Sequence, residues 1–225
     1  LDRAVATSLG RMLGLPALVG AIAANRVIRQ FIRTSPAARE TILLDELRFC
    51  VERNARERVP VVVDLPATGH AMSFLDTPRA VKRMLRVGPI AAAAERAEEM
   101  LHDARRCELV VVSLPEELPI NETIELVRRA NEIGVASRRV IVNQVPPSPV
   151  LAHERELLDV IGHCGEGAVG RFARSAHGDT HGADQARALI DRLQREVRAE
   201  ILEMPRCAAT DPRGCVEAMM RVLAP

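Results

Sequence analysis

The residues best suited to chemistry lie between positions 61 and 75, which read Val-Val-Val-Asp-Leu-Pro-Ala-Thr-Gly-His-Ala-Met-Ser-Phe-Leu. A run of β-branched residues ends at Asp64, and a Pro and a Gly follow before the apolar stretch. This order predicts a buried strand, a carboxylate at its carboxyl end, a sharp loop and a helix start. Ligands of open α/β sheets bind beyond the carboxyl ends of the strands. An Asp there commonly holds Mg²⁺ or a metal-bound water, and Gly69 would let the backbone approach a phosphate closely.

A second feature is a motif that the sequence lacks. No G-x-x-x-x-G-K-[ST] phosphate loop occurs in the 225 residues, and the chain begins at Leu1 rather than Met. We therefore expect a fragment, or a product whose N-terminus has been removed.

These residues must be positioned by strands and helices that alternate along the chain. Apolar runs predict strands over 59–64, 108–113, 139–143 and 201–204. Helices are expected over 3–14, 17–33, 36–58, 71–106 with a break near Gly88-Pro89, 121–133, 151–162, 185–200 and 212–223. The alternation predicts an α/β fold with a mostly parallel sheet, and the continuous apolar runs predict strands covered on both faces. The all-helical blocks at about 3–58 and 71–106 predict a helical subdomain.

Composition restricts the class of protein. Hydrophobic residues make up 48% of the chain, which suffices for the core of one large domain. Aromatic residues are only 2% and the net charge is +1, so nothing indicates a nucleic-acid binder. The sequence shows no signal peptide, and the apolar run 17–24 is too short to span a bilayer. We expect a cytoplasmic protein that is not an integral membrane protein.

The cysteines and histidines give weaker indications of metal chemistry. Five cysteines, an odd count without a C-x-x-C pair, predict reduced thiols rather than disulfides or a zinc site. Arsenite binding needs thiolates brought together, and nothing in the sequence joins Cys50 to Cys107. Residues 163–182 contain five Gly and three His and predict a loop. There His177, Asp179 and His181 could bind a metal, or could simply be solvated.

Four motifs, in order, resemble the ArsA/Get-type ATPases, which energise arsenite export or target tail-anchored membrane proteins. The second switch of that family typically reads D-T-A-P-T-G-H-T-L-R-x-L, and residues 64–75 read D-L-P-A-T-G-H-A-M-S-F-L. This chain keeps the Asp, the Thr-Gly-His and the final Leu. P-E-E-L-P at 115–119 with Glu122-Thr123, and V-I-V-N-Q at 140–144, resemble two later family segments. Met204-Pro205 and D-P-R-G at 211–214 resemble the loop over the adenine and the start of the last helix.

The resemblance implies a deviant P-loop NTPase fold of the MinD/ArsA type with a helical subdomain. It also implies ATP and Mg²⁺ as ligands, and a homodimer or an ATPase partner. In the family the phosphate-loop strand, which lies at the sheet centre, and the first switch precede the residues seen here. We therefore expect residues 1–225 to form one partial ATPase domain that hydrolyses no ATP on its own.

The resemblance also implies roles for individual residues. Asp64 would contact the Mg²⁺ through a water, and Gly69, flanked by Thr68 and His70, would donate its N–H to the γ-phosphate. Asn143 and Gln144 would contact the adenine, and Pro205 would lie in the loop that covers it. Hydrolysis would release the γ-phosphate and let residues 70–106 move. Simpler roles remain for three of these residues: Asp64 capping a helix, Asn143 satisfying a turn, and Pro205 ending a strand.

Two functions remain open. The chain is either part of an ATPase that moves a client- or partner-binding subdomain, or a relative without a phosphate loop that binds or regulates an intact ATPase. An unrelated MinD-like or dethiobiotin-synthase-like protein would explain the sheet but not the Thr-Gly-His.

A hydrophobic helical client would need an apolar groove, and flexible Met side chains suit one. The same residues could instead form an ordinary interhelix core. They are Met12, Leu13, Leu18, Val19, Ile22, Met72, Phe74, Leu75, Met84, Leu85 and Met100.

Overall fold

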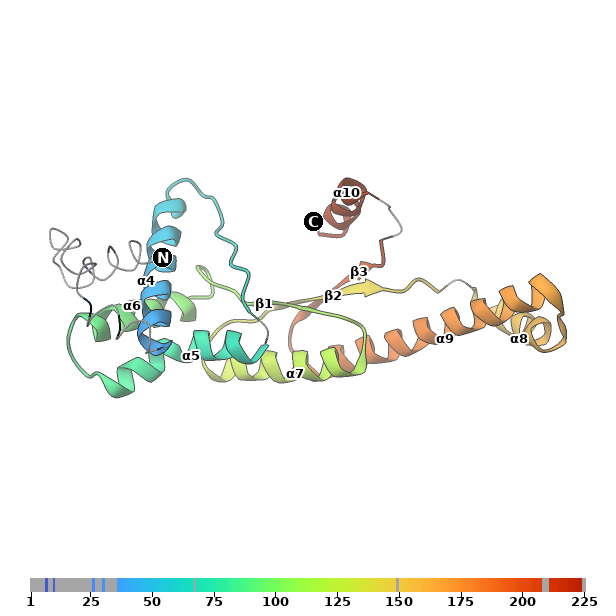
Figure 1. Cartoon of the computed structure of the whole chain (residues 1–225), viewed down its shortest axis with the longest axis horizontal. Helices are drawn as coiled ribbons and strands as arrows, with labels where there is room; N and C mark the ends of the chain where they lie inside the picture. Colours follow the sequence, from blue (N-terminus) through green and yellow to red (C-terminus); the bar gives the residue numbers. More distant parts are fainter. Residues whose placement is uncertain are drawn as a thin grey trace. The chain divides into compact units, whose positions relative to one another are not determined.

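Figure 1 shows the computed structural model of the chain. The structure describes residues 36–66, 68–148, 150–207 and 211–223, together with isolated positions 7, 10, 26 and 30. The helices expected over 3–14 and 17–33 lie outside the described residues. The chain divides into two compact units, one of residues 1–108 with 130–136 and the other of residues 109–129 with 137–225.

In the first unit, three helices pack against one another. They are α4 (Pro36–Ala55), α5 (Thr68–Met84) and α6 (Pro89–His102). The predicted break between the last two helices is confirmed. It includes Gly88, whose φ of 107° is a value that residues other than Gly rarely adopt. Pro89 then opens α6 at a position whose N–H needs no helical partner.

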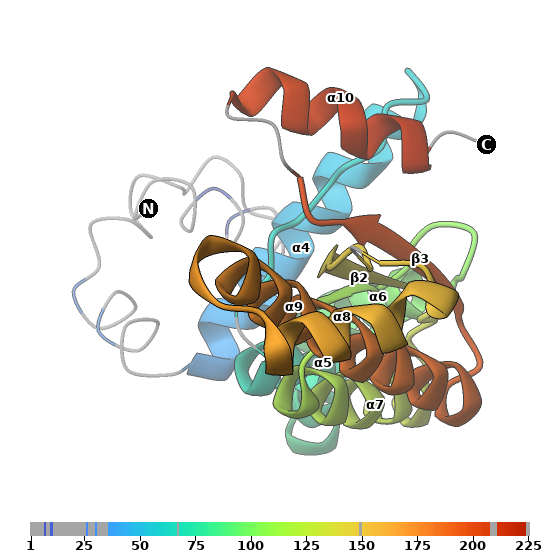
Figure 2. The same cartoon turned by 90° about the vertical axis from the view of Figure 1, so that its right-hand side faces the viewer.

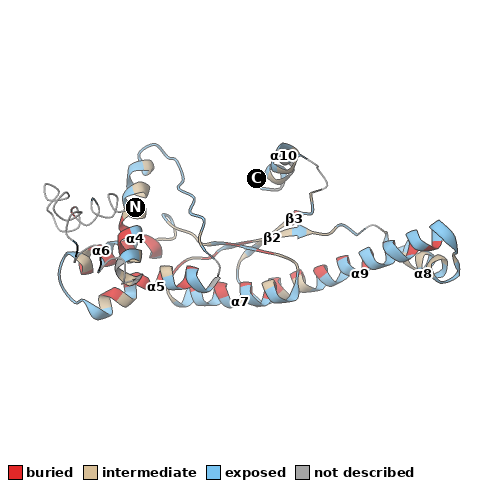
Figure 3. Ribbon diagram, in the orientation of Figure 1, coloured by how far each residue is buried: buried red, intermediate tan, exposed pale blue. Residues whose placement is uncertain are grey.

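Small side chains on α6 let the three helices approach closely. The buried residues of α6 include Ala91, Ala93, Ala94 and Ala97, and Ile42 of α4 packs on Ala93. Thr77 of α5 is buried, and its hydroxyl is hydrogen-bonded to the Glu40 carboxylate of α4. A 2.6 Å ion pair joins Lys82 of α5 to Glu98 of α6. Figure 3 shows buried residues on all three of these helices.

The strand expected over 59–64 is absent from the described structure, so that prediction was wrong. Residues 59–66 run without helix or strand structure after α4, and Val62 is 91% exposed. Strand formation needs a neighbouring backbone as well as β-branched residues, and no described strand pairs with this segment.

The second unit contains a parallel three-stranded sheet in the order β1-β2-β3. Its strands are β1 (Val110–Ser113), β2 (Arg139–Val145) and β3 (Glu200–Pro205). The predicted alternation of strands and helices is confirmed for these three strands. Helix α7 (Glu117–Glu132) connects β1 to β2, and α8 and α9 connect β2 to β3.

Helix α7 starts four residues before the expected cap Asn121, which is exposed inside it. Ile120 donates its N–H to the Glu116 carbonyl at 3.0 Å, so the helical turn already includes Glu117. Pro119 does not prevent this start, because the N–H groups of the first turn have no helical acceptor.

Among the described residues of the second unit, helices cover one face of the sheet, not both as predicted. Val111, Ser113, Val140 and Val142 are buried, while Val112 on the other face is 63% exposed. Among the described residues of this unit, the long helix α9 (Gly167–Glu196) lies on the same side of the sheet as α7 (Figures 1 and 2). The apolar runs therefore reflect strand propensity on the open face rather than burial.

The loop predicted over 163–182 is also wrong, because α9 begins at Gly167. Its buried side is a row of small residues spaced three or four apart, which packs closely and so tolerates the glycines. The row consists of Gly170, Ala173, Ala176, Thr180, Ala183 and Ala186, and it continues with Ile190 and Leu193. Helix α8 (Arg155–Cys164), preceded by the short 3₁₀ helix η2 (Ala152–Glu154), packs against α9.

Polar contacts hold α8 to α9, since α8 buries none of its own residues. Arg155 binds both carboxylate oxygens of Asp184 at 2.6 and 2.9 Å, and His177 lies 2.7 Å from Asp159. The last helix, α10 (Pro212–Leu223), starts and ends as predicted and contacts β3. No helix in the described part of the chain combines the length and apolarity that crossing a membrane requires.

Candidate functional site

A cleft of about 920 Å³ opens at the carboxyl ends of the three strands, within the second unit. This is the edge at which ligands of parallel sheets bind. Four segments line it: the residues between β1 and α7, the end of β2, the middle of α9, and the residue after β3. The lining residues are Leu114, Pro115, Glu116, Glu117, Gln144, Pro146, Pro147, Gly178, Asp179, Gly182, Gln185, Ala186, Ala188, Leu189 and Arg206.

The strand register changes where β2 reaches the cleft. Val142 pairs with Glu203 and Val145 pairs with Pro205, so Asn143 and Gln144 together stand opposite one residue of β3. Gln144 has a φ of 58°, in the left-handed region that residues other than Gly seldom adopt. A β-bulge of this kind turns a side chain away from the regular pleat and is frequent beside active sites.

Asn143 bonds to the backbone of its own bulge. Its Oδ1 accepts the N–H of Gln144 at 2.9 Å, which is the turn-satisfying role that the sequence left open. An amide oxygen can accept a second hydrogen bond, and the Nδ2 of the same group carries two further donors. The contact therefore fixes the amide without using up its capacity to recognise a base.

The end of β3 is anchored to the same bulge. Arg206, directly after Pro205, donates its N–H to the Val145 carbonyl at 2.9 Å. Glu203 directly precedes Met204. Its carboxylate accepts hydrogen bonds from the two terminal guanidinium nitrogens of Arg187 in α9, at 2.7 and 2.8 Å. The hydrogen bond to Glu203 raises the pKa of Arg187 above its ordinary value, although partial burial acts to lower it. Pro205 thus ends the strand, and it is exposed beside the cleft.

The charges around the cleft favour a neutral ligand group over a phosphate chain. Glu116, Glu117 and Asp179 bring three carboxyl groups to the lining, and Arg206 brings the one guanidinium. Carboxylates repel phosphates, whereas a base or a sugar can donate hydrogen bonds to them. Gln144 and Gln185 add two neutral amides to the same lining.

Asp64 and residues 68–70, which were expected to form a switch, belong to the first unit, whereas Asn143, Gln144 and Pro205 belong to the second. Asp64 is exposed in the extended segment before α5, and it does not end a strand as expected. Thr68, Gly69 and His70 form the first turn of α5. A Cβ added at Gly69 would meet no atom within 4 Å, so its backbone is open to an approaching group. The first N–H groups of a helix have no helical acceptor and attract anions.

Of the six candidate client residues that the structure describes, three belong to the interhelix core and Phe74 is half-buried. Met72, Leu75 and Met100 are 4%, 8% and 1% exposed. Met84, at the end of α5, is 77% exposed, and Leu85 follows it with 43%. The first five members of the candidate groove, Met12 to Ile22, lie outside the described residues.

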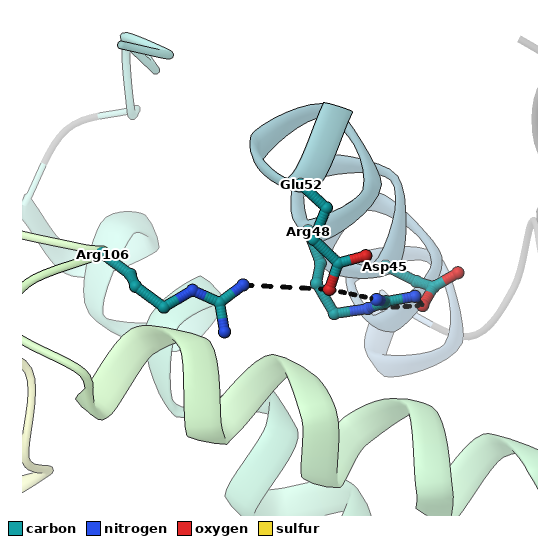
Figure 4. A network of polar contacts seen from close by, with 4 residues as sticks. All are labelled: Asp45, Arg48, Glu52 and Arg106. Carbon is teal, nitrogen blue, oxygen red and sulfur yellow. Dashed lines mark hydrogen bonds and ion pairs between the residues drawn. The ribbon is translucent and has the colours of Figure 1, made fainter. Parts of the chain in front are cut away.

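A polar network ties α4 to the segment after α6 (Figure 4). Arg48 lies 3.1 Å from the buried Asp45 and 2.7 Å from Glu52, and Arg106 lies 3.8 Å from the same Glu52 oxygen. Burial alone would lower the pKa of Arg48, but the hydrogen bonds and charges of Glu52 and Asp45 raise it above its ordinary value. Because Asp45 is 1% exposed and paired, the network is a structural one.

The histidines of 163–182 are placed by a helical hairpin rather than by a loop. His177 contacts Asp159, His163 contacts the Asp159 carbonyl at 2.7 Å, and His181 contacts Gln185. In the part of the chain that the structure describes, no group of three or more His, Cys, Asp or Glu is arranged to hold a metal. For the thiols, burial raises the pKa of Cys107, and the charge of Glu108 adds to it, which disfavours a metalloid-binding thiolate.

The sequence alone did not identify Arg206, or Gln185 and Asp179 of α9, as cleft residues. Arg206 follows Pro205 directly and could have been named from its position. Asp179 and Gln185 were not identified as cleft residues, because the segment that carries Asp179 was assigned to a loop. The available signal was the row of small residues spaced three or four apart in 170–186.

A family model matches part of the chain. Residues 89–156 match the model of a family described as anion-transporting ATPases of the ArsA type. The matched part contains the P-E-E-L-P and V-I-V-N-Q segments, and Asp64 and the Thr-Gly-His at 68–70 precede it. The resemblance to this family is therefore confirmed.

The chain is also similar to three curated proteins that are named as ATPases. The chain is 31% identical over 118 residues to the ATPase BagA of Mycobacterium tuberculosis strain H37Rv. It is equally similar to proteins named as ATPases from Mycobacterium bovis and from a second M. tuberculosis strain. The match covers 51% of this chain but 34% of each relative, so it spans about a third of the relatives' length.

Proposed function

We propose, from this resemblance to the anion-transporting ATPases, that the chain carries the adenine-binding part and the second switch of an ATP-hydrolysing ATPase. Nucleotide state in that enzyme would move the helices α5 and α6, and with them a client- or partner-binding surface. The fold is then a deviant P-loop NTPase of the MinD/ArsA type, which works as a homodimer or with an ATPase partner in the cytoplasm. The observation that carries the proposal is the bulge at Asn143–Gln144 beside the cleft.

The adenine would lie in the cleft of the second unit. Adenine presents an amino donor next to a ring-nitrogen acceptor, and an amide side chain matches this pair with its oxygen and its NH₂ group. Asn143 carries both atoms and is fixed through the N–H of Gln144, which lines the cleft, although Asn143 itself is not among the lining residues. The carboxylates of the lining would repel the phosphates, so the phosphates would lie outside the cleft.

The phosphates would meet the first turn of α5. Gly69 has no side chain to block them, and the free N–H groups of Thr68, Gly69 and His70 lie at the positive end of the helix dipole. The exposed Asp64 carboxylate would hold a Mg²⁺-bound water, and the metal would offset the charge of the phosphates. Loss of the γ-phosphate would release the first turn of α5. Because α5 packs against α4 and α6, this release would let the helices of the first unit move.

The adenine-binding role is tested by titrating the 225-residue chain with AMP while its backbone and side-chain amides are followed by NMR. We expect shifts confined to the cleft residues and to Asn143. Asn143→Ala should weaken binding about tenfold, the loss expected for about 1.4 kcal/mol of hydrogen bonding. Ribose 5-phosphate should cause no such shifts, because it lacks the base.

Asn121 provides the matched control, since it is an exposed Asn inside α7 and not part of the cleft lining. Asn121→Ala should bind AMP as the unchanged chain does. Equal shifts with AMP and ribose 5-phosphate, or unchanged AMP binding in Asn143→Ala, would remove the adenine assignment.

A further inference from the structure

Two glycines of helix α9 form part of the cleft wall. Gly178 and Gly182 both line the cleft, and residues four apart on a helix lie on the same face, one above the other. Gln185 and Leu189 continue this face at the next turns, and they also line the cleft. Between the two glycines, over a rise of about 6 Å, the helix therefore presents backbone without side chains to the cleft.

Neither glycine is required by the packing or the backbone of the described structure. A Cβ added at Gly178 or at Gly182 would meet no atom within 4 Å, and neither residue has a positive φ. Gly170 of the same helix differs, because a Cβ there would clash with the Gly165 carbonyl oxygen. Glycine is a poor helix former, so the two cleft glycines weaken α9 without a compensating contact in the described chain. The open space above them indicates room for a group that does not belong to the chain.

We propose that Gly178 and Gly182 form the floor of the base-binding pocket, and that the flat face of an adenine ring packs directly on the α9 backbone there. The inference rests on the proposed function, which puts adenine in this cleft, and it adds the surface that holds the ring. Asn143 would contact the edge of the base through hydrogen bonds, whereas the two glycines would contact its face through van der Waals packing. Each glycine carries a hydrogen where other residues carry a Cβ, so the ring can approach the helix more closely.

The remaining lining suits a planar ring with polar edges. Ala186 and Leu189 extend the apolar surface of α9, and Pro146 and Pro147 add apolar lining after β2. Gln185 adds an amide that can hydrogen-bond to the edge of a base. Apolar walls with a few polar groups are typical of small-molecule sites.

The proposal predicts opposite effects of one substitution on stability and on binding. Gly182→Ala and Gly178→Ala should each raise the urea midpoint of unfolding, because Ala is the better helix former. The added Cβ would lift the ring off the helix, so the dissociation constant of adenosine should rise about tenfold in each variant. Loss of binding through damage to the fold would instead be accompanied by a lower urea midpoint.

The unchanged chain gives a second, independent measurement. The whole 225-residue chain is titrated with adenosine while the Hα protons of Gly178 and Gly182 are followed by NMR. We expect both pairs of Hα protons to move upfield, because the ring current of a base stacked on them shields them. The chain has no Trp, no Tyr and only four Phe, so few rings of its own contribute such shifts. Ribose 5-phosphate, which has no aromatic ring, should leave these protons in place.

Gly162→Ala is the matched control for the two substitutions. Gly162 lies in α8 and is not part of the cleft lining. A Cβ there would make only ordinary contacts, the nearest at 3.7 Å from the Arg174 side chain. Adenosine should bind this variant as it binds the unchanged chain.

Two results would overturn the proposal, and they can be told apart. In the first, adenosine binds and Asn143→Ala weakens it, but the glycine Hα protons do not shift and both cleft Gly→Ala variants bind adenosine normally. The base then lies elsewhere in the cleft, and only the glycine floor is wrong. In the second, adenosine does not bind to the chain, and the adenine-binding function fails together with the floor.

Discussion

Asn143 shows how far a residue type can predict a role. Its place at the end of an apolar run indicated the carboxyl edge of a strand, and the structure puts it there. The bulge that turns Asn143 and Gln144 could not be predicted, because it results from the register between β2 and β3, which are 55 or more residues apart along the chain. Asp64 shows the opposite outcome, since its strand depends on a pairing that the described residues do not provide.

Burial distinguishes Cys107 from the exposed Cys164. Burial and the charge of Glu108 raise the pKa of Cys107, so less of it is thiolate at neutral pH than in an ordinary thiol. We expect iodoacetamide to alkylate Cys107 at least about tenfold more slowly than Cys164 near neutral pH. Mass spectrometry of timed digests measures both rates, and a rise in pH should accelerate Cys107.

The unfolded chain provides the control for this prediction. In denaturant the two cysteines should react at rates within about threefold of each other, because both are then solvated. Equal rates in the folded chain would show that Cys107 is not shielded.

At the level of elements, helix boundaries set by Pro and Gly were predicted well, and glycines inside a helix were not. Pro36, Gly88-Pro89 and Pro212 mark helix starts or breaks as expected. Residues 163–182 were assigned to a loop because they contain five Gly and three His, yet residues 167–182 form the first half of α9. Close packing of the small residues on the buried side of α9 outweighs the low helix propensity of Gly.

Two of these glycines should respond oppositely to substitution by Ala. A Cβ at Gly170 would lie 1.9 Å from the Gly165 carbonyl oxygen, whereas a Cβ at Gly178 would meet no atom within 4 Å. Gly170→Ala should therefore lower the free energy of unfolding by about 1–3 kcal/mol through overpacking. Gly178→Ala should raise it by up to about 1 kcal/mol, because Ala favours the helix.

Urea unfolding followed by circular dichroism measures both changes, and each variant controls for the other because the chemical change is the same. A Gly170→Ala variant as stable as the unchanged chain would show that the Gly165–Gly170 contact is not needed where α8 turns into α9.

For the whole molecule, the alternation of strands and helices sufficed to predict an α/β fold with a parallel sheet. It did not predict that Val112 is 63% exposed on the sheet face opposite Val111. Nor did it predict that α7 contributes to both compact units, with residues 117–129 in the second unit and 130–132 in the first. Both features depend on contacts between segments far apart in sequence, which local patterns cannot specify.

The adenine is proposed to bind in the cleft of the second unit, and the 225 residues contain no phosphate loop. A phosphate loop supplies a nest of backbone N–H groups and a Lys, so most of the affinity for a triphosphate depends on it. Affinity for the base alone should not depend on it.

The most direct test is a comparison of the dissociation constants of adenosine and of ATP with Mg²⁺ for the 225-residue chain. We predict that both ligands bind weakly and within about tenfold of each other, a difference of at most about 1.4 kcal/mol, and that no ATP is hydrolysed. ATP binding more than about a hundredfold tighter than adenosine, Mg²⁺-dependent hydrolysis, or no binding of adenosine at all would contradict it.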